Sequence, residues 1–295
     1  MPTVLITGSN GFLGQHLTLY LAAKGYTVIA TGRGPSRIAV PGSFQYESLD
    51  ITDPLAVDQC LTKYQPSVII HNAAMSKPDE CEQNRDLCFL NNVSATSFLL
   101  NASKSFSPHF IYISTDFIFG ENGPHAETAI PAPLNFYGES KLQAEKLVKE
   151  SGLLYSIVRP VFIYGPCFTG MRPSFLHWVK QNLEAKKKIK VVSDQQRTPT
   201  FATDICKGIE TILLQQEGGD FHLAGKDILT PYEIAVKVTE VLHLDASLIE
   251  QANADSFPEP VKRAKRSGLQ IDKARQLLHY NPVSFAEGIA LTFKN

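Results

Sequence analysis

The sequence has almost no net charge and few charged residues overall. Its 28 basic and 29 acidic side chains give a formal net charge of −1, and charged residues make up 19% of the chain. This balance creates no global attraction to nucleic acid or to an anionic membrane, so we expect neither as a partner. The basic runs at 186–188 and 262–266 are therefore interpreted as solvated faces, with the second run kept as a candidate for a phosphate contact.

Cysteine is also scarce. The chain has five, Cys60, Cys81, Cys88, Cys167 and Cys206, and no two of them form a Cys-x-x-Cys pair. An odd number without that spacing favours neither a disulfide framework nor a zinc site. We expect reduced, mostly buried thiols and no bound metal.

Long hydrophobic runs, internal repeats and low-complexity tracts are absent from the sequence. No apolar run reaches the length needed to span a bilayer. The first run, Val4-Leu5-Ile6, is short, lacks a basic flank and leads into a glycine-rich turn, which predicts a strand and not a signal peptide. A cytoplasmic location is the resulting expectation.

What the first half does contain is an alternation of short apolar runs with amphipathic segments of helical length. This alternation predicts an α/β fold, a Rossmann-type doubly wound parallel sheet with crossover helices. The predicted strands are Thr3–Thr7, Thr27–Thr31, Phe44–Leu49, Val68–His71, Phe110–Ser114 and Tyr155–Arg159. The predicted helices lie near 12–24, 54–64, 84–105 and 136–151.

After Pro160 this regularity fades, which indicates a smaller second domain. A helix near 173–187 and a strand at Ile189–Val192 would belong to it, whereas a helix near 202–216 and the apolar run 221–224 indicate a return to the main sheet. The predicted units are a dinucleotide-binding domain over 1–160, rejoined by 200–225, and a C-terminal substrate-capping domain formed by 161–199 and 226–295.

A Gly-x-x-Gly-x-x-Gly motif lies directly after the first predicted strand and opens the first predicted helix. Glycine permits the tight turn and the close approach of backbone to a pyrophosphate, and the helix N-terminus favours the anion. A glycine-rich turn without a ligand is the alternative. The motif predicts a dinucleotide contact through Gly8, Ser9, Asn10, Gly11, Phe12, Leu13 and Gly14.

The end of the second predicted strand bears on the choice of cofactor. It lacks the acidic residue that holds the ribose hydroxyls in NAD-binding units and has Arg33 instead. A guanidinium suits a 2′-phosphate, with Arg37 as a second candidate, although either arginine could be an exposed loop residue. NADP(H) is the preferred cofactor and NAD(H) the alternative. Further cofactor contacts are expected at two strand ends, from Asp50 and Ile51 and from Asn72, Ala73 and Ala74.

Tyr137 and Lys141 lie four positions apart on the helix predicted near 136–151, so they share one face. An ammonium beside a phenol favours the ionised phenol and lowers its pKa toward the range useful for proton transfer. The pair therefore predicts a hydride-transfer site. The same spacing also occurs by chance on many amphipathic helices.

The glycine-rich loop, Asn72-Ala73-Ala74, Ser114-Thr115-Asp116 and Tyr137-x-x-x-Lys141 follow one another along the chain. In this order they resemble the extended short-chain dehydrogenase/reductase superfamily. Within it, the strings at 114–120, 132–138 and 194–200 resemble the dTDP-4-dehydrorhamnose reductase family.

The resemblance implies that Thr115, Tyr137 and Lys141 are the catalytic group. Thr115, with Ser114 as the alternative hydroxyl, would hydrogen-bond the reacting carbonyl oxygen, and Tyr137 would protonate it. Lys141 would favour the ionised form of the Tyr137 phenol and hold the nicotinamide ribose. Both residues are therefore also expected to contact the cofactor. Asn92 resembles the active-site asparagine of the superfamily, and a helix-surface amide is the alternative.

A sugar-nucleotide substrate is also implied by the resemblance. Asp116 and Phe117 would contact the sugar, and the planar guanidinium of Arg197 would contact the diphosphate. Trp178 has two interpretations, lining the same cleft or belonging to the apolar core. The segment 263–269 departs from the reductases, because it lacks the proline of their Arg-Pro-x-x-Ser-x-Leu pattern.

The implied reaction is the NADPH-dependent reduction of the 4-keto group of a nucleotide-linked deoxysugar, as in dTDP-L-rhamnose synthesis. A sugar-nucleotide epimerase or dehydratase would share the cofactor and the Tyr137/Lys141 pair. A non-catalytic NADP-binding regulatory subunit is the alternative from another class, because the string at 130–135 also resembles the β subunits of methionine adenosyltransferase. A homodimer is a further expectation.

Overall fold

The computed structural model describes residues 2–168, 170–171, 173–257 and 261–294. Within these residues, seven parallel strands form the main sheet in the order β10-β6-β5-β4-β1-β2-β3. They are β1 (Thr3–Thr7), β2 (Thr27–Gly32), β3 (Phe44–Ser48), β4 (Val68–His71), β5 (His109–Ile113), β6 (Tyr155–Arg159) and β10 (Gly219–His222). The chain winds outward in both directions from the neighbouring strands β1 and β4, so the predicted doubly wound Rossmann-type fold is confirmed.

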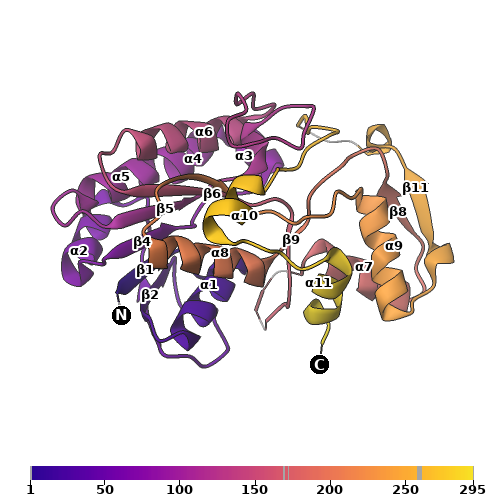
Figure 1. Cartoon of the computed structure of the whole chain (residues 1–295), viewed down its shortest axis with the longest axis horizontal. Helices are drawn as coiled ribbons and strands as arrows, with labels where there is room; N and C mark the ends of the chain where they lie inside the picture. Colours follow the sequence, from indigo (N-terminus) through magenta and orange to yellow (C-terminus); the bar gives the residue numbers. More distant parts are fainter. Residues whose placement is uncertain (1, 169, 172, 258–260, 295) are drawn as a thin grey trace.

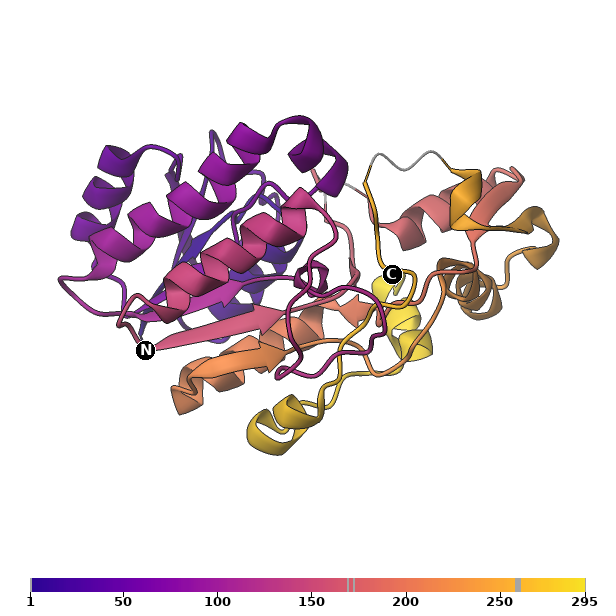
Figure 2. The ribbon, with the colours of Figure 1, turned by 90° about the horizontal axis from the view of Figure 1, so that it is seen from above.

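Helices cover both faces of this sheet (Figures 1 and 2). The helices on one face are α2 (Pro54–Tyr64), α5 (Ala95–Ser103) and α6 (Phe136–Lys149), and those on the other are α1 (Phe12–Ala23) and α8 (Ala202–Gln215). Successive residues of β1 serve the two faces in turn: Val4 and Ile6 pack with α1 and α8, and Leu5 packs with α2 and α5. This is the period-two pattern of a strand buried on both sides.

One predicted helix is wrong in its detail. The segment 84–105 is not a single helix but α4 (Arg85–Phe89), a π-helical turn (Leu90–Ser94) and α5, and the short helix α3 (Pro78–Gln83) precedes it. The wider turn carries Asn92, whose side chain is hydrogen-bonded to the backbone of Met75 in the loop after β4. π-Helical turns of this kind are frequent at functional sites.

The chain beyond β6 builds a second group of elements, on the right of Figure 1. Its elements are β7 (Ile163–Tyr164), α7 (Phe175–Glu184), β8 (Ile189–Val192), β9 (Thr200–Phe201), α9 (Pro231–Leu242), β11 (Ile249–Ala252) and α11 (Phe285–Thr292). They share an apolar core of their own. α8, β10 and α10 (Asp272–Leu278) lie at the main sheet. The division into two domains stays a prediction.

None of the helices in the described part of the chain combines the length and the apolar character needed to cross a membrane.

Candidate active site

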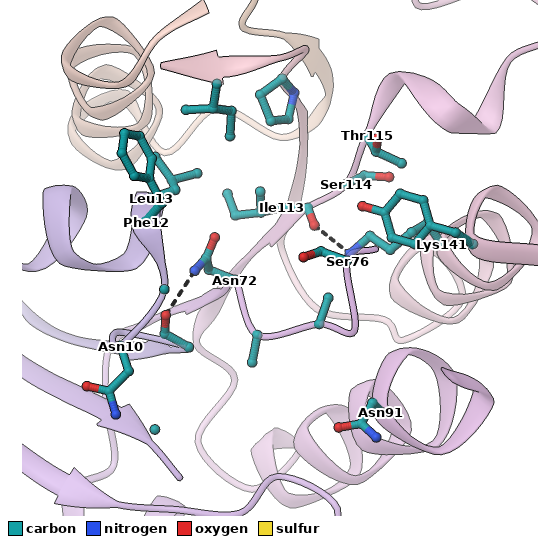
Figure 3. Close-up of a pocket in the computed structure, with 18 of the residues that line it drawn as sticks. Asn10, Phe12, Leu13, Asn72, Ser76, Asn91, Ile113, Ser114, Thr115 and Lys141 are labelled. Atoms are coloured by element: carbon teal, nitrogen blue, oxygen red, sulfur yellow. Dashed lines mark hydrogen bonds between the residues drawn. The ribbon is translucent and has the colours of Figure 1, made fainter. Parts of the chain in front are cut away.

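A cavity of about 580 Å³ lies at the carboxyl edge of the sheet, next to the central strands β1 and β4 (Figure 3). Ligands bind at this edge in open α/β sheets, where the strand order reverses. The cavity brings together most of the predicted site residues. Those that line it are Gly8, Asn10, Gly11, Phe12, Leu13, Arg33, Ile51, Asn72, Ala73, Ala74, Thr115, Asp116, Phe117, Tyr137 and Lys141.

The glycine-rich loop presents the N-terminus of α1 to this cavity. Gly11 is the N-cap, and in the first turn of α1, all of it described, there is neither a side-chain cap nor an acidic residue. The first N–H groups and the positive end of the helix dipole are therefore suited to an anion. Gly8 has φ of +71°, and a Cβ there would lie 2.7 Å from the Cα of Ala73, so only glycine allows this contact with the loop after β4.

Three residues predicted to contact a dinucleotide, Ser9, Gly14 and Asp50, do not line the cavity. The Ser9 hydroxyl donates to a carbonyl of β1 (3.0 Å) and accepts an N–H of β2 (3.2 Å). A Cβ on Gly14 would lie 2.1 Å from the carbonyl oxygen of Gly8. The Asp50 carboxylate accepts the N–H and the hydroxyl of Thr52 (2.9 and 2.7 Å). These three residues shape the loop and the strand end from behind.

Two guanidinium groups flank one end of the cavity. Arg33 and Arg37 both line it, and both are exposed. Asn10 fixes the loop that carries them, because its side-chain oxygen accepts the N–H of Arg37 (2.7 Å) and its amide donates to the hydroxyl of Tyr46 (2.9 Å). The sequence offered a cavity contact and an exposed loop as alternatives, and the two arginines combine both features.

α6 carries Tyr137 and Lys141 into the cavity. The helix begins there because the side chain of Asn135 caps it, accepting the N–H of Gly138 at 3.1 Å. The Lys141 ammonium donates to the carbonyl oxygen of Ile113 at 2.7 Å, as Figure 3 shows, and lies 4.1 Å from the centroid of the Tyr112 ring. Both side chains are buried.

The prediction that Lys141 lowers the pKa of the Tyr137 phenol is wrong. Burial raises the pKa of Tyr137, against a hydrogen bond with Thr115 that acts to lower it. Burial lowers the pKa of Lys141 from 10.5 to about 7, opposed by the charge of Glu145. Desolvation is the largest cause of both pKa shifts, and the spacing of two residues along a helix does not show desolvation. The phenol keeps its proton at neutral pH.

The two candidate hydroxyls lie side by side at the end of β5 (Figure 3). Thr115 caps a short 3₁₀ turn, since its Oγ1 accepts the N–H of Phe117 (3.2 Å) and donates to Asp116 (3.3 Å). The buried Ser114 hydroxyl has no hydrogen-bond partner within the described residues. A buried hydroxyl without a partner, on the wall of a polar cavity, is suited to hydrogen-bond a ligand. Ser114 and Thr115 therefore both remain candidates for the catalytic hydroxyl.

Asn92 is 1% exposed, which excludes the helix-surface alternative. Its side chain accepts the N–H of Met75 (2.8 Å) and donates to the Met75 carbonyl (3.0 Å) and to Ser140 Oγ (2.9 Å). Ser140 in turn donates to the carbonyl of Tyr137 (2.8 Å). Asn92 thus fastens the loop after β4 to the first turn of α6, and its neighbour Asn91 lines the cavity instead.

A second cavity, of about 390 Å³, adjoins the first and shares Asp116, Phe117 and Phe162 with its lining. Trp178 lines this cavity, is 41% exposed and stacks on Phe175 with ring centroids 5.6 Å apart. The interpretation of Trp178 as a core residue is therefore wrong, and its place in a substrate cleft stays a prediction.

Arg197 lines the second cavity and not the first. Its guanidinium donates to the carbonyl oxygen of Ala264 (2.9 Å) and to Oε1 of Gln195 (2.8 Å). Asp116 accepts the Ser267 hydroxyl (3.0 Å); burial raises the pKa of this carboxyl, although the charge of Arg197 acts against the shift. The segment 261–269 is therefore tied to Asp116 and Arg197, two of the three residues predicted to contact the substrate.

Sequence reasoning missed a second arginine at this cavity. Arg263 lines it, and one nitrogen of its guanidinium donates to both carboxylate oxygens of Asp79, each at 2.9 Å. The partners are 184 positions apart, so only the basic run at 262–266 could have pointed to this residue. No cluster of three or more potential metal ligands occurs in the residues that the structure covers.

The parallel sheet, the glycine-rich loop at its central strand and the Tyr137/Lys141 pair on one cavity define the extended short-chain dehydrogenase/reductase class. The chain belongs to the family described as RmlD substrate binding domain, whose model matches residues 2–295.

Known proteins of this kind resemble the chain along nearly its whole length. The "Probable low-salt glycan biosynthesis reductase Agl14" of Haloferax volcanii is 30% identical, over 90% of this chain and 89% of the relative. The "Methionine adenosyltransferase 2 subunit beta" of Pongo abelii is 31% identical, over 93% and 82%. The crystal structure of dTDP-4-dehydrorhamnose reductase from Bacillus anthracis in complex with NADP is 28% identical and superposes with a TM-score of 0.87, covering 99% of this chain and 98% of that one.

Proposed function

We propose that this protein uses NADPH to reduce the 4-keto group of a nucleotide-linked deoxysugar, with dTDP-4-dehydrorhamnose as its substrate. The observation that carries the proposal is that Thr115, Tyr137 and Lys141 line one cavity with the glycine-rich loop. The likeness to the NADP-bound reductase of Bacillus anthracis supports it.

The residues at one end of the cavity fit a phosphorylated dinucleotide. The uncapped N-terminus of α1 suits a pyrophosphate, and the glycines at 8 and 11 leave the loop without side chains there. Arg33 suits a 2′-phosphate because its guanidinium is a planar, permanently charged donor. Bound NADPH would supply a hydride for the carbonyl carbon.

The chain's own residues would handle the carbonyl oxygen. Tyr137, which burial keeps protonated at neutral pH, would give its proton to this oxygen as negative charge develops there. Thr115, or the neighbouring Ser114, would donate a hydrogen bond to the same oxygen. Lys141 would hold the nicotinamide ribose through its ammonium. Asp116 and Phe117, on the wall shared by the two cavities, would contact the sugar, and Arg197 the diphosphate.

NADPH oxidation with a panel of keto-sugar nucleotides tests this proposal, with Tyr137→Phe as the matched inactive variant. We expect turnover with dTDP-4-dehydrorhamnose that depends on Tyr137. Inversion of a stereocentre of the sugar without net NADPH oxidation would instead identify an epimerase, and loss of water from the sugar would identify a dehydratase. Light scattering of the same preparation tests the expected homodimer.

A second candidate function is favoured by the 31% identity to a methionine adenosyltransferase β subunit. An NADP-binding regulatory subunit would bind NADPH and oxidise none of it with any substrate in the panel. Binding without turnover in an assay that detects a known reductase would therefore contradict the reductase proposal and support this one.

A further inference from the structure

Cys81 and Cys88 form a pair of thiols behind the cavity. Cys81 lies in α3 and Cys88 in α4, and the chain turns between these helices at Asn84. Both side chains are fully buried and pack with Tyr137 in one apolar cluster. The two thiols are near enough to shift each other's pKa. Their separation of seven positions is not a redox motif, so the sequence gives no sign of the pairing.

The surroundings make the two thiols unequal. Cys81 donates to the carbonyl oxygen of Met75 (3.3 Å), and Cys88 accepts the side-chain amide of Asn92 (3.4 Å). An accepted N–H favours the thiolate of Cys88, whereas the carbonyl acceptor favours the thiol of Cys81. The interaction between the two sulfurs lowers the pKa of Cys88 and raises that of Cys81. Cys88 is therefore the thiol that loses its proton more readily.

The wall of the cavity lies next to this pair. Ser76 and Asn91 line the cavity. They adjoin Met75 and Asn92, whose polar atoms contact the two sulfurs. Tyr137 packs with both thiols and also lines the cavity, so a small oxidant would reach the pair through this wall.

We propose that Cys81 and Cys88 are a reversible modification site, at which a hydroperoxide oxidises the dithiol to a disulfide. The Cys88 thiolate attacks the terminal peroxide oxygen, an S–O bond forms as the O–O bond breaks, and the other oxygen leaves as alkoxide, or as hydroxide from hydrogen peroxide. The Cys81 sulfur then attacks the sulfenic acid at Cys88, an S–S bond forms as the S–O bond breaks, and the Cys81 proton leaves in water. Both sulfurs are oxidised, and the peroxide receives the two electrons.

The disulfide would change the wall of the cavity. An S–S bond is about 2.05 Å long, well below the separation of two sulfurs that are not bonded to each other. Its formation would draw Cys88 away from Asn92 and Ser140, which hold the Met75 loop and the first turn of α6. This inference goes beyond the proposed function and does not depend on the reaction that the cavity supports.

Hydrogen peroxide added to the full chain at neutral pH tests the proposal, without any need for activity. Remaining thiols are alkylated, and peptides are mapped without reduction. We expect a peptide that links Cys81 to Cys88, the loss of two thiols, and full recovery with dithiothreitol. The pair should react at least about tenfold faster than Cys60, because burial raises the pKa of that thiol to about 11.

Two variants sharpen this test. Cys60→Ser should form the same linked peptide at the wild-type rate. Cys81→Ser removes the resolving thiol, so Cys88 should proceed to the sulfinic acid, which dithiothreitol does not reduce. Oxidation of the half-buried Cys167 while Cys81 and Cys88 stay intact would overturn the proposal, and so would loss of both thiols in the wild type without a linked peptide.

Discussion

The ammonium of Lys141 donates a 2.7 Å hydrogen bond to the carbonyl oxygen of Ile113, the last residue of β5. The bond fastens the Tyr137 face of α6 to the carboxyl edge of the sheet. Lys141 is 2% exposed, so it exchanges its hydration for a neutral carbonyl and the ring of Tyr112. Because that exchange disfavours the charged form, burial lowers the pKa of Lys141 to about 7.

Lys141→Met should therefore change stability in a pH-dependent way. A folded-state pKa of about 7 against 10.5 unfolded means that the unfolded chain binds more protons between these values. The cost of burying the ammonium is full below about pH 7 and shrinks as the pH rises toward 10.5, by up to about 1.4 kcal/mol per pH unit. The variant should gain stability over the wild type most at low pH. Urea unfolding of both proteins at about pH 6 and pH 9 measures the difference, and an unchanged difference would contradict the buried charge.

Tyr137→Phe should abolish most of the proposed reduction and leave NADPH affinity intact. The substitution removes only the hydroxyl that donates the proton, and general acid catalysis contributes about 10²–10⁴-fold. The kcat of NADPH oxidation, with the Kd for NADPH from a direct titration, measures both effects. Turnover near the wild-type value would remove Tyr137 from the reaction.

The sequence was a good guide where a local pattern decides the structure. β1 and β6 have the predicted bounds, because apolar residues of a parallel strand face two cores and leave a continuous run. The Gly8–Gly14 motif likewise predicted a loop between the first strand and the first helix. The helices α9, α10 and α11 were not predicted, since the pattern after Pro160 is irregular.

Contacts between distant segments could not be predicted. Asp116 meets Ser267 across 151 positions. The raised pKa of Tyr137 and the lowered pKa of Lys141 depend on burial that only the packed chain creates. The π-helical turn around Asn92 has the same origin, because it depends on a partner in the loop after β4. Local sequence therefore identified which residues belong to the cavity better than it identified their protonation states.

Arg33→Ala should weaken NADPH binding and leave NADH binding nearly unchanged. A charge-assisted contact contributes about 1.5–3 kcal/mol, which is roughly one to two decades in Kd. Arg37→Ala, on the same exposed loop, is the matched comparison and should have the smaller effect. Titration of both cofactors into each variant measures the preference. Equal weakening of NADPH and NADH by Arg33→Ala would show that this guanidinium does not contact the 2′-phosphate.

Alanine substitutions at two glycines of the loop should have different effects, one on NADPH binding and the other on stability. A Cβ on Gly11 would lie 3.2 Å from the Gly8 carbonyl oxygen, whereas on Gly14 it would lie 2.1 Å from the same atom. Gly11→Ala should therefore fold and bind NADPH more weakly, because its methyl group obstructs the anion at the N-terminus of α1. Gly14→Ala should lower Tm sharply, because the backbone at Gly8 must move to make room for the added Cβ. Thermal unfolding and NADPH titration distinguish the two, and equal Tm values would contradict this assignment.

Arg197→Lys should lower stability as well as raise the KM for the sugar nucleotide. The planar guanidinium donates hydrogen bonds to Ala264 from one nitrogen and to Gln195 from another. The single ammonium group of a lysine cannot reproduce this arrangement. Loss of one such bond in a buried setting costs about 1–3 kcal/mol. The Kd for NADPH should stay unchanged, because Arg197 does not line the first cavity.

Arg266→Lys, at an exposed position of the neighbouring segment, is the control and should be neutral. Chemical unfolding, KM and Kd are measured for both variants. An Arg197→Lys protein with wild-type stability and a raised KM would assign this arginine to the substrate alone, whereas wild-type values of both would exclude it from the site.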